Sequence, residues 1–112
     1  MPTFISQGRY SRDALQGMMK SPEDRTEAVS KLLQGVGGKL LSYYVTFGER
    51  DWLLIAEAPD AQAISAAVLA AAAGGGVTDV STTVAMTSSE AMAAFKKAGD
   101  LAASFKSAGQ GR

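Results

Sequence analysis

The sequence contains no cysteine and no histidine among its 112 residues. Without cysteine, the chain can build no disulfide scaffold, no thiolate metal site and no thiol nucleophile. Without histidine, it lacks the commonest metal ligand, the usual proximal ligand of haem and the usual general base. A metal site made only of carboxylates stays open, but no run like the calcium-binding pattern DxDxDG supports one. We therefore predict no metal and no cofactor.

A net charge and a long hydrophobic segment are missing as well. The 11 lysines and arginines balance the 11 aspartates and glutamates, whereas a nucleic-acid-binding protein needs a basic surface. The longest apolar run, residues 64–73, is far too short to span a bilayer, and the N-terminus lacks the features of a signal peptide. We therefore expect a cytoplasmic protein with no nucleic-acid partner and no membrane partner.

The most informative stretch, residues 39–58, has the pattern of a β-hairpin. Residues 39–47 and 52–58 are rich in β-branched and aromatic side chains, and the turn Gly48-Glu49-Arg50-Asp51 separates them. If Phe47 pairs with Trp52, one face is wholly apolar. That face comprises Leu41, Tyr43, Val45, Phe47, Trp52, Leu54 and Ala56.

The other face of this hairpin is mixed in character. It comprises Ser42, Tyr44, Thr46, Leu53, Ile55 and Glu57. A solvated sheet face should be cleanly polar, and this one is too apolar for water and too polar for a sealed core. We expect a partner subunit, a ligand or both to cover it.

Outside the hairpin, strand-like and helix-like segments alternate. Residues 2–9 and 77–86 have the pattern of strands, and residues 61–73 that of a helix. Helix starts are marked by side chains that can accept a hydrogen bond from the first backbone N–H groups. These caps are Ser11, Ser21 followed by Pro22, Asp60, and Thr87 with Glu90.

The order of these segments predicts the fold class. It is β-α-β-β-α-β with an extra C-terminal helix, an α+β arrangement of the ferredoxin-like type. We expect one domain over residues 1–106 and a flexible tail over residues 107–112. Two right-handed crossovers place both helical connections on one face of the sheet and leave the other face bare.

Three segments resemble the GYD domain family: MPTFISQGRYS, GGKLLSYYVTFGERDWLLIAEAPD and TxxAMTSSE. The resemblance covers roughly residues 2–95, and Arg50 stands where the family's G-x-Y-D turn has tyrosine. It implies a dimeric α+β barrel in which two ferredoxin-like sheets face each other. The structural relatives of that barrel include monooxygenases, haem-degrading enzymes, isomerases and stress-response proteins, so the fold does not choose an activity.

Five side chains are candidates for contacting a ligand: Tyr10, Tyr44, Arg50, Asp51 and Trp52. The hairpin pairing directs Tyr44 into the barrel, and Arg50 and Asp51 would lie at its mouth with Trp52 beside them. Rims and loops carry binding sites more often than cores do. Ordinary turn chemistry and tyrosines that bond within the protein are the competing interpretations.

The sequence assigns no catalytic residue. The glycines at residues 35–38 lead from a helix into a strand, which is typical of a helix end and not of a phosphate-binding loop. Pro2 would offer a basic amine only if Met1 were removed.

We therefore predict a homodimeric binding or structural module that holds a small apolar or aromatic molecule between its sheet and a partner. Phe95 and Phe105 of the C-terminal helix are candidates for a higher assembly, and the competing expectation is that this helix lies over the sheet. The alternative function is a cofactor-independent monooxygenase or isomerase, in which Tyr44, Arg50 or Asp51 would converge on a cavity.

Overall fold

The computed structural model describes residues 1–109, so residues 110–112 of the expected tail lie outside the described residues. Its eight elements are β1 (Thr3–Tyr10), α1 (Arg12–Lys20), α2 (Thr26–Gly35), β2 (Lys39–Val45), β3 (Trp52–Glu57), α3 (Ala61–Ala73), β4 (Val77–Ala85) and α4 (Ser88–Ala102). No helix within residues 1–109 is both long enough and apolar enough to cross a membrane.

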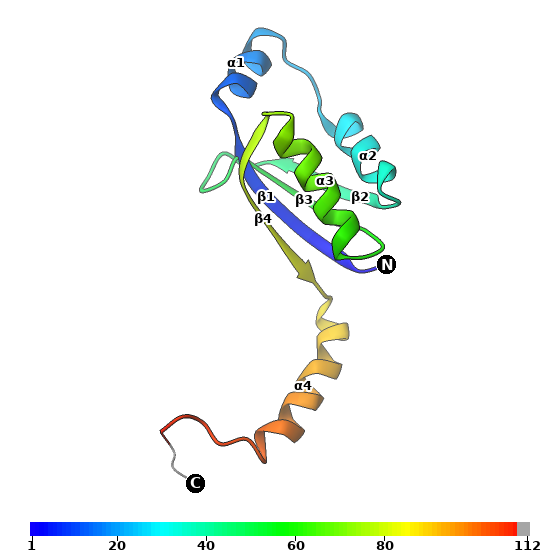
Figure 1. Cartoon of the computed structure of the whole chain (residues 1–112), viewed down its shortest axis with the longest axis vertical. Coiled ribbons are helices and arrows are strands. Elements are labelled where there is room, and N and C mark those ends of the chain that lie inside the picture. The colour runs from blue at the N-terminus through cyan, green and yellow to red at the C-terminus, as the bar shows by residue number, and fades with distance from the viewer. Residues whose placement is uncertain (110–112) are drawn as a thin grey trace.

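The strands form one four-stranded antiparallel sheet in the order β2-β3-β1-β4. Helices α2 and α3 cover one face of this sheet, and the short helix α1 lies beyond one end of it (Figure 1). This arrangement confirms the predicted ferredoxin-like α+β fold. We call the sheet face without helices the outer face.

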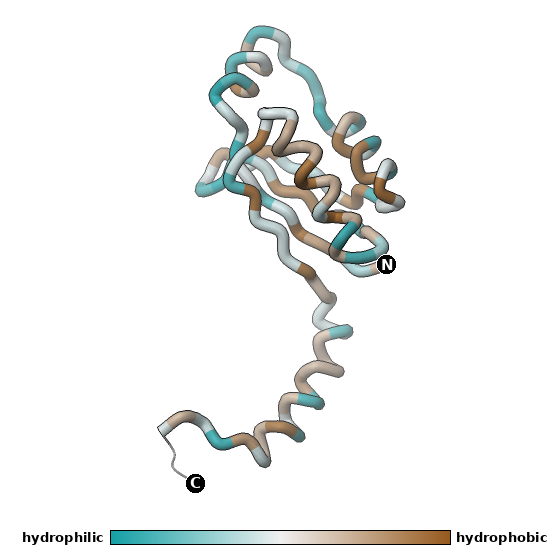
Figure 2. The backbone as a smooth tube through the Cα atoms, viewed as in Figure 1, coloured by the Kyte–Doolittle hydropathy of each residue, from teal (hydrophilic) through white to brown (hydrophobic). Residues whose placement is uncertain are grey.

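The core lies between the sheet and helices α2 and α3. Alternate residues of β1 and β3 are buried there because successive strand residues point to opposite faces. The buried hydrophobic residues are Phe4, Leu33, Trp52, Leu54, Ala56, Ala58, Ile64 and Ala67. Figure 2 shows hydrophobic segments along α2, α3 and the strands that they cover.

Three of the four predicted helix caps are confirmed. The side chains of Ser11 and Asp60 accept hydrogen bonds from backbone N–H groups three residues later, and Thr87 forms a complete capping box with Glu90. The helix start predicted at Ser21 is wrong, because Ser21 ends α1 and α2 begins only at Thr26. Asp24 causes the delay: its Oδ1 accepts from the backbone N of Thr26 at 2.9 Å and from its hydroxyl at 2.6 Å.

The hairpin register also differs from the prediction. Val45, not Phe47, pairs with Trp52, and Tyr43 pairs with Leu54. The loop is longer than expected because Thr46 closes it by donating from its backbone N to the carbonyl of Asp51 at 2.9 Å. Phe47 then lies outside the strand with φ of 46° and is exposed.

A register shift in β2 moves two leucines relative to the prediction. The pairing with β3 shifts between Leu40 and Ser42, so Leu40 packs against the core. Leu41, predicted on the apolar face, is 45% exposed instead. Because the hairpin slipped by an even number of residues, Tyr43 and Leu54 keep the face that was predicted for them.

Helix α4 does not lie over the sheet, so that expectation was wrong. Figure 1 shows it projecting from the end of β4, away from the rest of the molecule, and none of its residues is buried. The described chain therefore measures 63 × 30 × 22 Å.

Candidate functional site

The outer face has an apolar centre. Phe4, Ser6 and Gly8 of β1 are buried against the helices, so their neighbours Ile5 and Gln7 point the other way. Ile5 pairs with Ile55 and Gln7 pairs with Leu53. Leu53 of β3 in turn pairs with Tyr44 of β2, which is 59% exposed. The outer face thus has a continuous patch that no helix within residues 1–109 covers, formed by Ile5, Leu53, Ile55 and Tyr44.

Hydrogen bonds connect the hairpin loop to β1 and β4. Asp51 accepts a hydrogen bond from the backbone N of Tyr10 at 2.9 Å, and its own backbone N donates to the carbonyl of Gly8 at 2.8 Å. Arg50 donates from Nη1 to the carbonyl of Asp79 at 3.0 Å. Arg50 and Asp51, which the sequence offered as candidates for contacting a ligand, therefore hold β4 and β1 to the end of the hairpin.

Trp52 belongs to the core. Its side chain is 6% exposed, and its indole lies directly over Gly8, the residue it pairs with on β1. The indole Nε1 has no hydrogen-bond partner among residues 1–109. A buried donor without a partner costs about 1–3 kcal/mol, so the packing of the ring must offset that cost.

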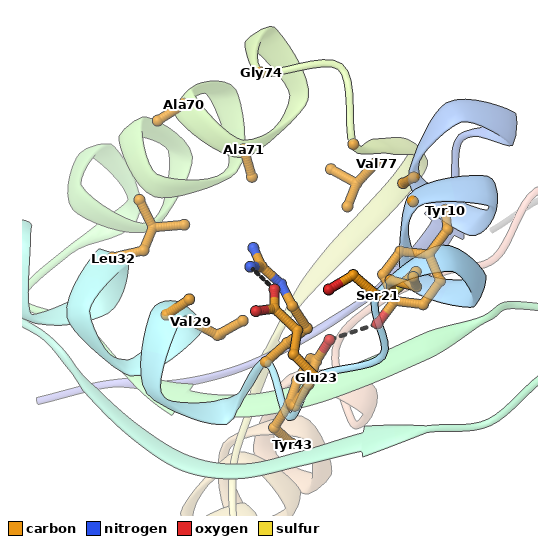
Figure 3. Close-up of a pocket in the computed structure, with 16 residues that line it drawn as sticks. Tyr10, Ser21, Glu23, Val29, Leu32, Tyr43, Ala70, Ala71, Gly74 and Val77 are labelled. Carbon is orange, nitrogen blue, oxygen red and sulfur yellow. Dashed lines mark hydrogen bonds and ion pairs between the residues drawn. The ribbon is translucent and has the colours of Figure 1, made fainter.

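A cavity of about 640 Å³ opens on the other side of the sheet, between α1, α2 and the C-terminal end of α3. We call it the helix-side pocket. Val29 and Leu32 of α2 and Ala71 of α3 form its apolar walls, and Tyr10 and Tyr43 rise from the sheet (Figure 3). Ligand pockets in proteins commonly have volumes of about 300–1,000 Å³.

Two polar pairs lie in this pocket. The hydroxyls of Tyr10 and Tyr43 are hydrogen-bonded at 2.5 Å, and Arg25 donates to Glu23 at 2.7 Å. Burial, and then the hydrogen bond to Tyr43, raises the pKa of Tyr10 well above its usual value, while the nearby Arg25 charge lowers it in part. The Tyr10 hydroxyl therefore stays protonated through the neutral range and keeps its hydrogen for donation.

The five candidate residues do not share one site. Tyr10 lines the helix-side pocket, Trp52 is in the core, and Tyr44 lies on the outer face. Arg50 and Asp51 brace the loop. A cavity between the sheet and a partner needs a second copy of the chain, so ligand binding by these residues stays a prediction.

Sequence reasoning did not single out Glu23 and Arg25, because it placed residues 22–25 in the first turn of a helix. The available signal was the short motif at residues 21–26. Ser21 and Pro22 end one helix, and Asp24 followed by Thr26 can form a local side-chain turn that starts the next one late. Read that way, residues 22–25 form a charged loop between two helices.

The fold and the bare outer face define a small ferredoxin-like α+β module, and the comparison with known families identifies it. Residues 4–95 match the GYD domain family, so the chain belongs to this family. A curated relative in Thermus thermophilus is the "Glutamine synthetase and cystathionine beta-lyase binding protein". It is 31% identical over 77 residues, which cover 69% of this chain and 81% of the relative.

Solved structures share the fold. An AsnC family transcriptional regulator from Agrobacterium tumefaciens aligns with a TM-score of 0.52 and 25% identity, over 77% of this chain and 50% of the regulator. The chain thus spans about half the length of that regulator. The structure of TTHA0845 from Thermus thermophilus aligns with a TM-score of 0.50 and 16% identity, over 79% of this chain and 96% of that protein.

Proposed function

We propose that this chain is a homodimeric binding module in which two copies pair through their outer faces. The observation that carries the proposal is an apolar patch on a face that none of the described helices covers, formed by Ile5, Leu53, Ile55 and Tyr44. An antiparallel sheet with one solvated face normally presents polar residues there. A twofold pairing places this patch against its own copy, and burying one isoleucine contributes about 1.5–3 kcal/mol.

The outer face alone is small for a stable dimer. Its strands have 6 to 9 residues, and with strand spacings near 4.8 Å the flat area of the sheet is roughly 500 Å². Stable complexes bury about 800 Å² per partner. A second surface, which α4 offers, therefore adds to the area that the outer face can bury.

Helix α4 carries an exposed apolar stripe. Ala91, Phe95, Ala98 and Ala102 recur at spacings of four and three residues, the spacing of one helix face. Phe95 is 73% exposed. Phe105 is equally exposed, but the prediction that it belongs to this helix was wrong, because α4 ends at Ala102. Because α4 projects beyond the end of β4 (Figures 1 and 2), its stripe is free to contact the second copy, and it offers a contact for a higher assembly.

The dimer is tested by sedimentation velocity of Ile55→Asp beside a matched control. Ile55→Asp places an unpaired charge in the interface, which is strongly unfavourable, so this variant should sediment as a monomer. Leu69→Asp makes a similar change at a site that is 68% exposed on α3, away from the outer face, and should remain dimeric like the unmodified chain. A folded Ile55→Asp variant that stays dimeric would contradict the pairing face.

The curated relative suggests a partner other than a second copy of the chain, because it is named for binding glutamine synthetase and cystathionine beta-lyase. We propose that this module also binds a cytoplasmic enzyme of that kind, which would place it in the cytoplasm. Surface plasmon resonance with glutamine synthetase purified from the same organism tests this, with an unrelated enzyme of similar charge as the control. Saturable binding to glutamine synthetase alone is expected, and equal responses to both enzymes would refute it.

The alternative function, a cofactor-independent monooxygenase or isomerase, needs polar groups that converge on one cavity. Tyr44 lies on the outer face, whereas Arg50 and Asp51 bond to the backbone of β4 and β1. None of the three lines the helix-side pocket. Their separation favours a binding module over an enzyme.

A further inference from the structure

We propose that the helix-side pocket is a binding site for a small carboxylic acid with an apolar or aromatic body. This site lies on the face of the sheet opposite to the proposed dimer interface, so the inference goes beyond the proposed function. It rests on three features of the pocket: unused hydrogen-bond donors, a weakly held guanidinium, and small apolar walls.

The tyrosine pair holds one unused donor. Two hydroxyls supply two hydrogens, and the bond between Tyr10 and Tyr43 uses one of them. Neither hydroxyl has another partner among residues 1–109. The second hydrogen is therefore available to an acceptor in the cavity. Ser21 adds another hydroxyl, which Figure 3 shows directed into the same space.

The Arg25 guanidinium provides the charge. It has five N–H groups, and its one hydrogen bond within residues 1–109 goes to Glu23, two residues earlier in the chain. The side chains of Arg25 and Glu23 are 46% and 57% exposed, and exposed ion pairs of this kind contribute only about 0–1 kcal/mol. A ligand carboxylate can therefore take over the guanidinium, which binds carboxylates through two parallel hydrogen bonds.

The remaining walls fit a hydrocarbon or an aromatic ring. Val29, Leu32, Ala71 and Val77 present only apolar side chains, and Met18 of α1 adds a flexible thioether that adapts to irregular shapes. The small side chain of Ala71 takes up little of the cavity. A carboxylate bound at Arg25 and Tyr10 thus leaves the body of the ligand between α2 and α3.

The probe for this site is 3-phenylpropanoate, compared with its neutral amide and with 3-phenylpropylamine. Titrations followed by ¹H–¹⁵N correlation spectra of the full chain should shift the amide signals of Tyr10, Tyr43 and Ala71. The carboxylate should bind about tenfold more tightly than the amide or the amine, because hydrogen bonds to a charged partner are about twice as strong as neutral ones. Equal affinities for the three probes would overturn the proposal, as would an absence of shifts at about 10 mM probe.

Arg25→Gln tests the assigned residue, and Arg12→Gln is the matched control. Arg12 is an exposed arginine of the neighbouring helix α1 that does not line the pocket. Arg25→Gln should weaken binding of 3-phenylpropanoate about tenfold and leave the amide unaffected, whereas Arg12→Gln should change neither. Equal effects of the two substitutions would refute the site. Because Ile55→Asp leaves this pocket intact, a monomeric variant should still bind the probe, so the dimer and the pocket can fail separately.

Discussion

Gly8→Ala is the substitution for which the structure gives the most definite expectation. Gly8 lies on β1 beneath the indole of Trp52. A methyl group at Gly8 would lie 2.5 Å from Cζ2 and 2.9 Å from Cε2 of that ring, and 3.1 Å from the backbone oxygen of Thr78. Carbon atoms prefer separations of about 3.5–4.0 Å, so the ring or the strand must move.

The cost follows from how firmly the ring is held. Trp52 is 6% exposed within the core, and the backbone of Thr78 blocks the methyl group from the side of β4. Overpacking of this kind costs about 1–3 kcal/mol of unfolding free energy. Alanine restricts the unfolded chain more than glycine does, and this stabilises the folded state by about 0.4–1 kcal/mol. We expect a net loss of about 1.3 kcal/mol, which lowers the melting temperature of a domain this size by roughly 5 °C.

Chemical denaturation followed by Trp52 fluorescence measures this loss, since Trp52 is the single tryptophan in the chain. Gly17→Ala is the matched control. A methyl group at Gly17 meets nothing within 4 Å, and within α1 it should raise helix stability by about 0.5–1 kcal/mol. If Gly8→Ala were as stable as the unmodified chain, the close contact between Trp52 and β1 would be wrong.

Substitutions at two further residues test the polar contacts. Asp51→Ala should cost about 1.5–3 kcal/mol of unfolding free energy, because the backbone N of Tyr10 loses its charged acceptor. Asp51→Asn keeps an acceptor and should recover most of that loss in urea titrations; equal losses would argue against the hydrogen bond. Burial and the bond to Tyr43 raise the pKa of Tyr10, so the unfolded chain loses this proton first and stability should fall as the pH rises above about 10. Tyr10→Phe should flatten that decline, and parallel pH profiles for the two proteins would contradict a buried, hydrogen-bonded hydroxyl.

Local chemistry made most of the fold predictable from the sequence. Ser11, Asp60 and Thr87 cap helices as expected because each cap depends on residues within one turn. The strand alternation of β1 and β3 likewise depends only on neighbours in the chain. Together they fix the element order, and that order restricts the topology.

The features that the sequence did not predict depend on contacts between distant segments or on competing local bonds. The hairpin register is set by Thr46 closing its loop onto Asp51, not by matching apolar residues. The start of α2 is set by the bonds from Asp24 to Thr26. The pocket arises where Tyr10 and Tyr43, 33 residues apart, meet beside that displaced helix start.

The outer-face dimer is tested most directly by isotope-filtered NMR on a sample that mixes labelled and unlabelled chains. This experiment detects only protons that approach each other across the interface between two copies. Methyl protons of Ile5, Leu53 and Ile55 should show intermolecular contacts, since they form the apolar centre of the outer face. Contacts that involve only helix-side residues such as Leu69, or none at all with a sedimentation mass of 11.6 kDa, would contradict it.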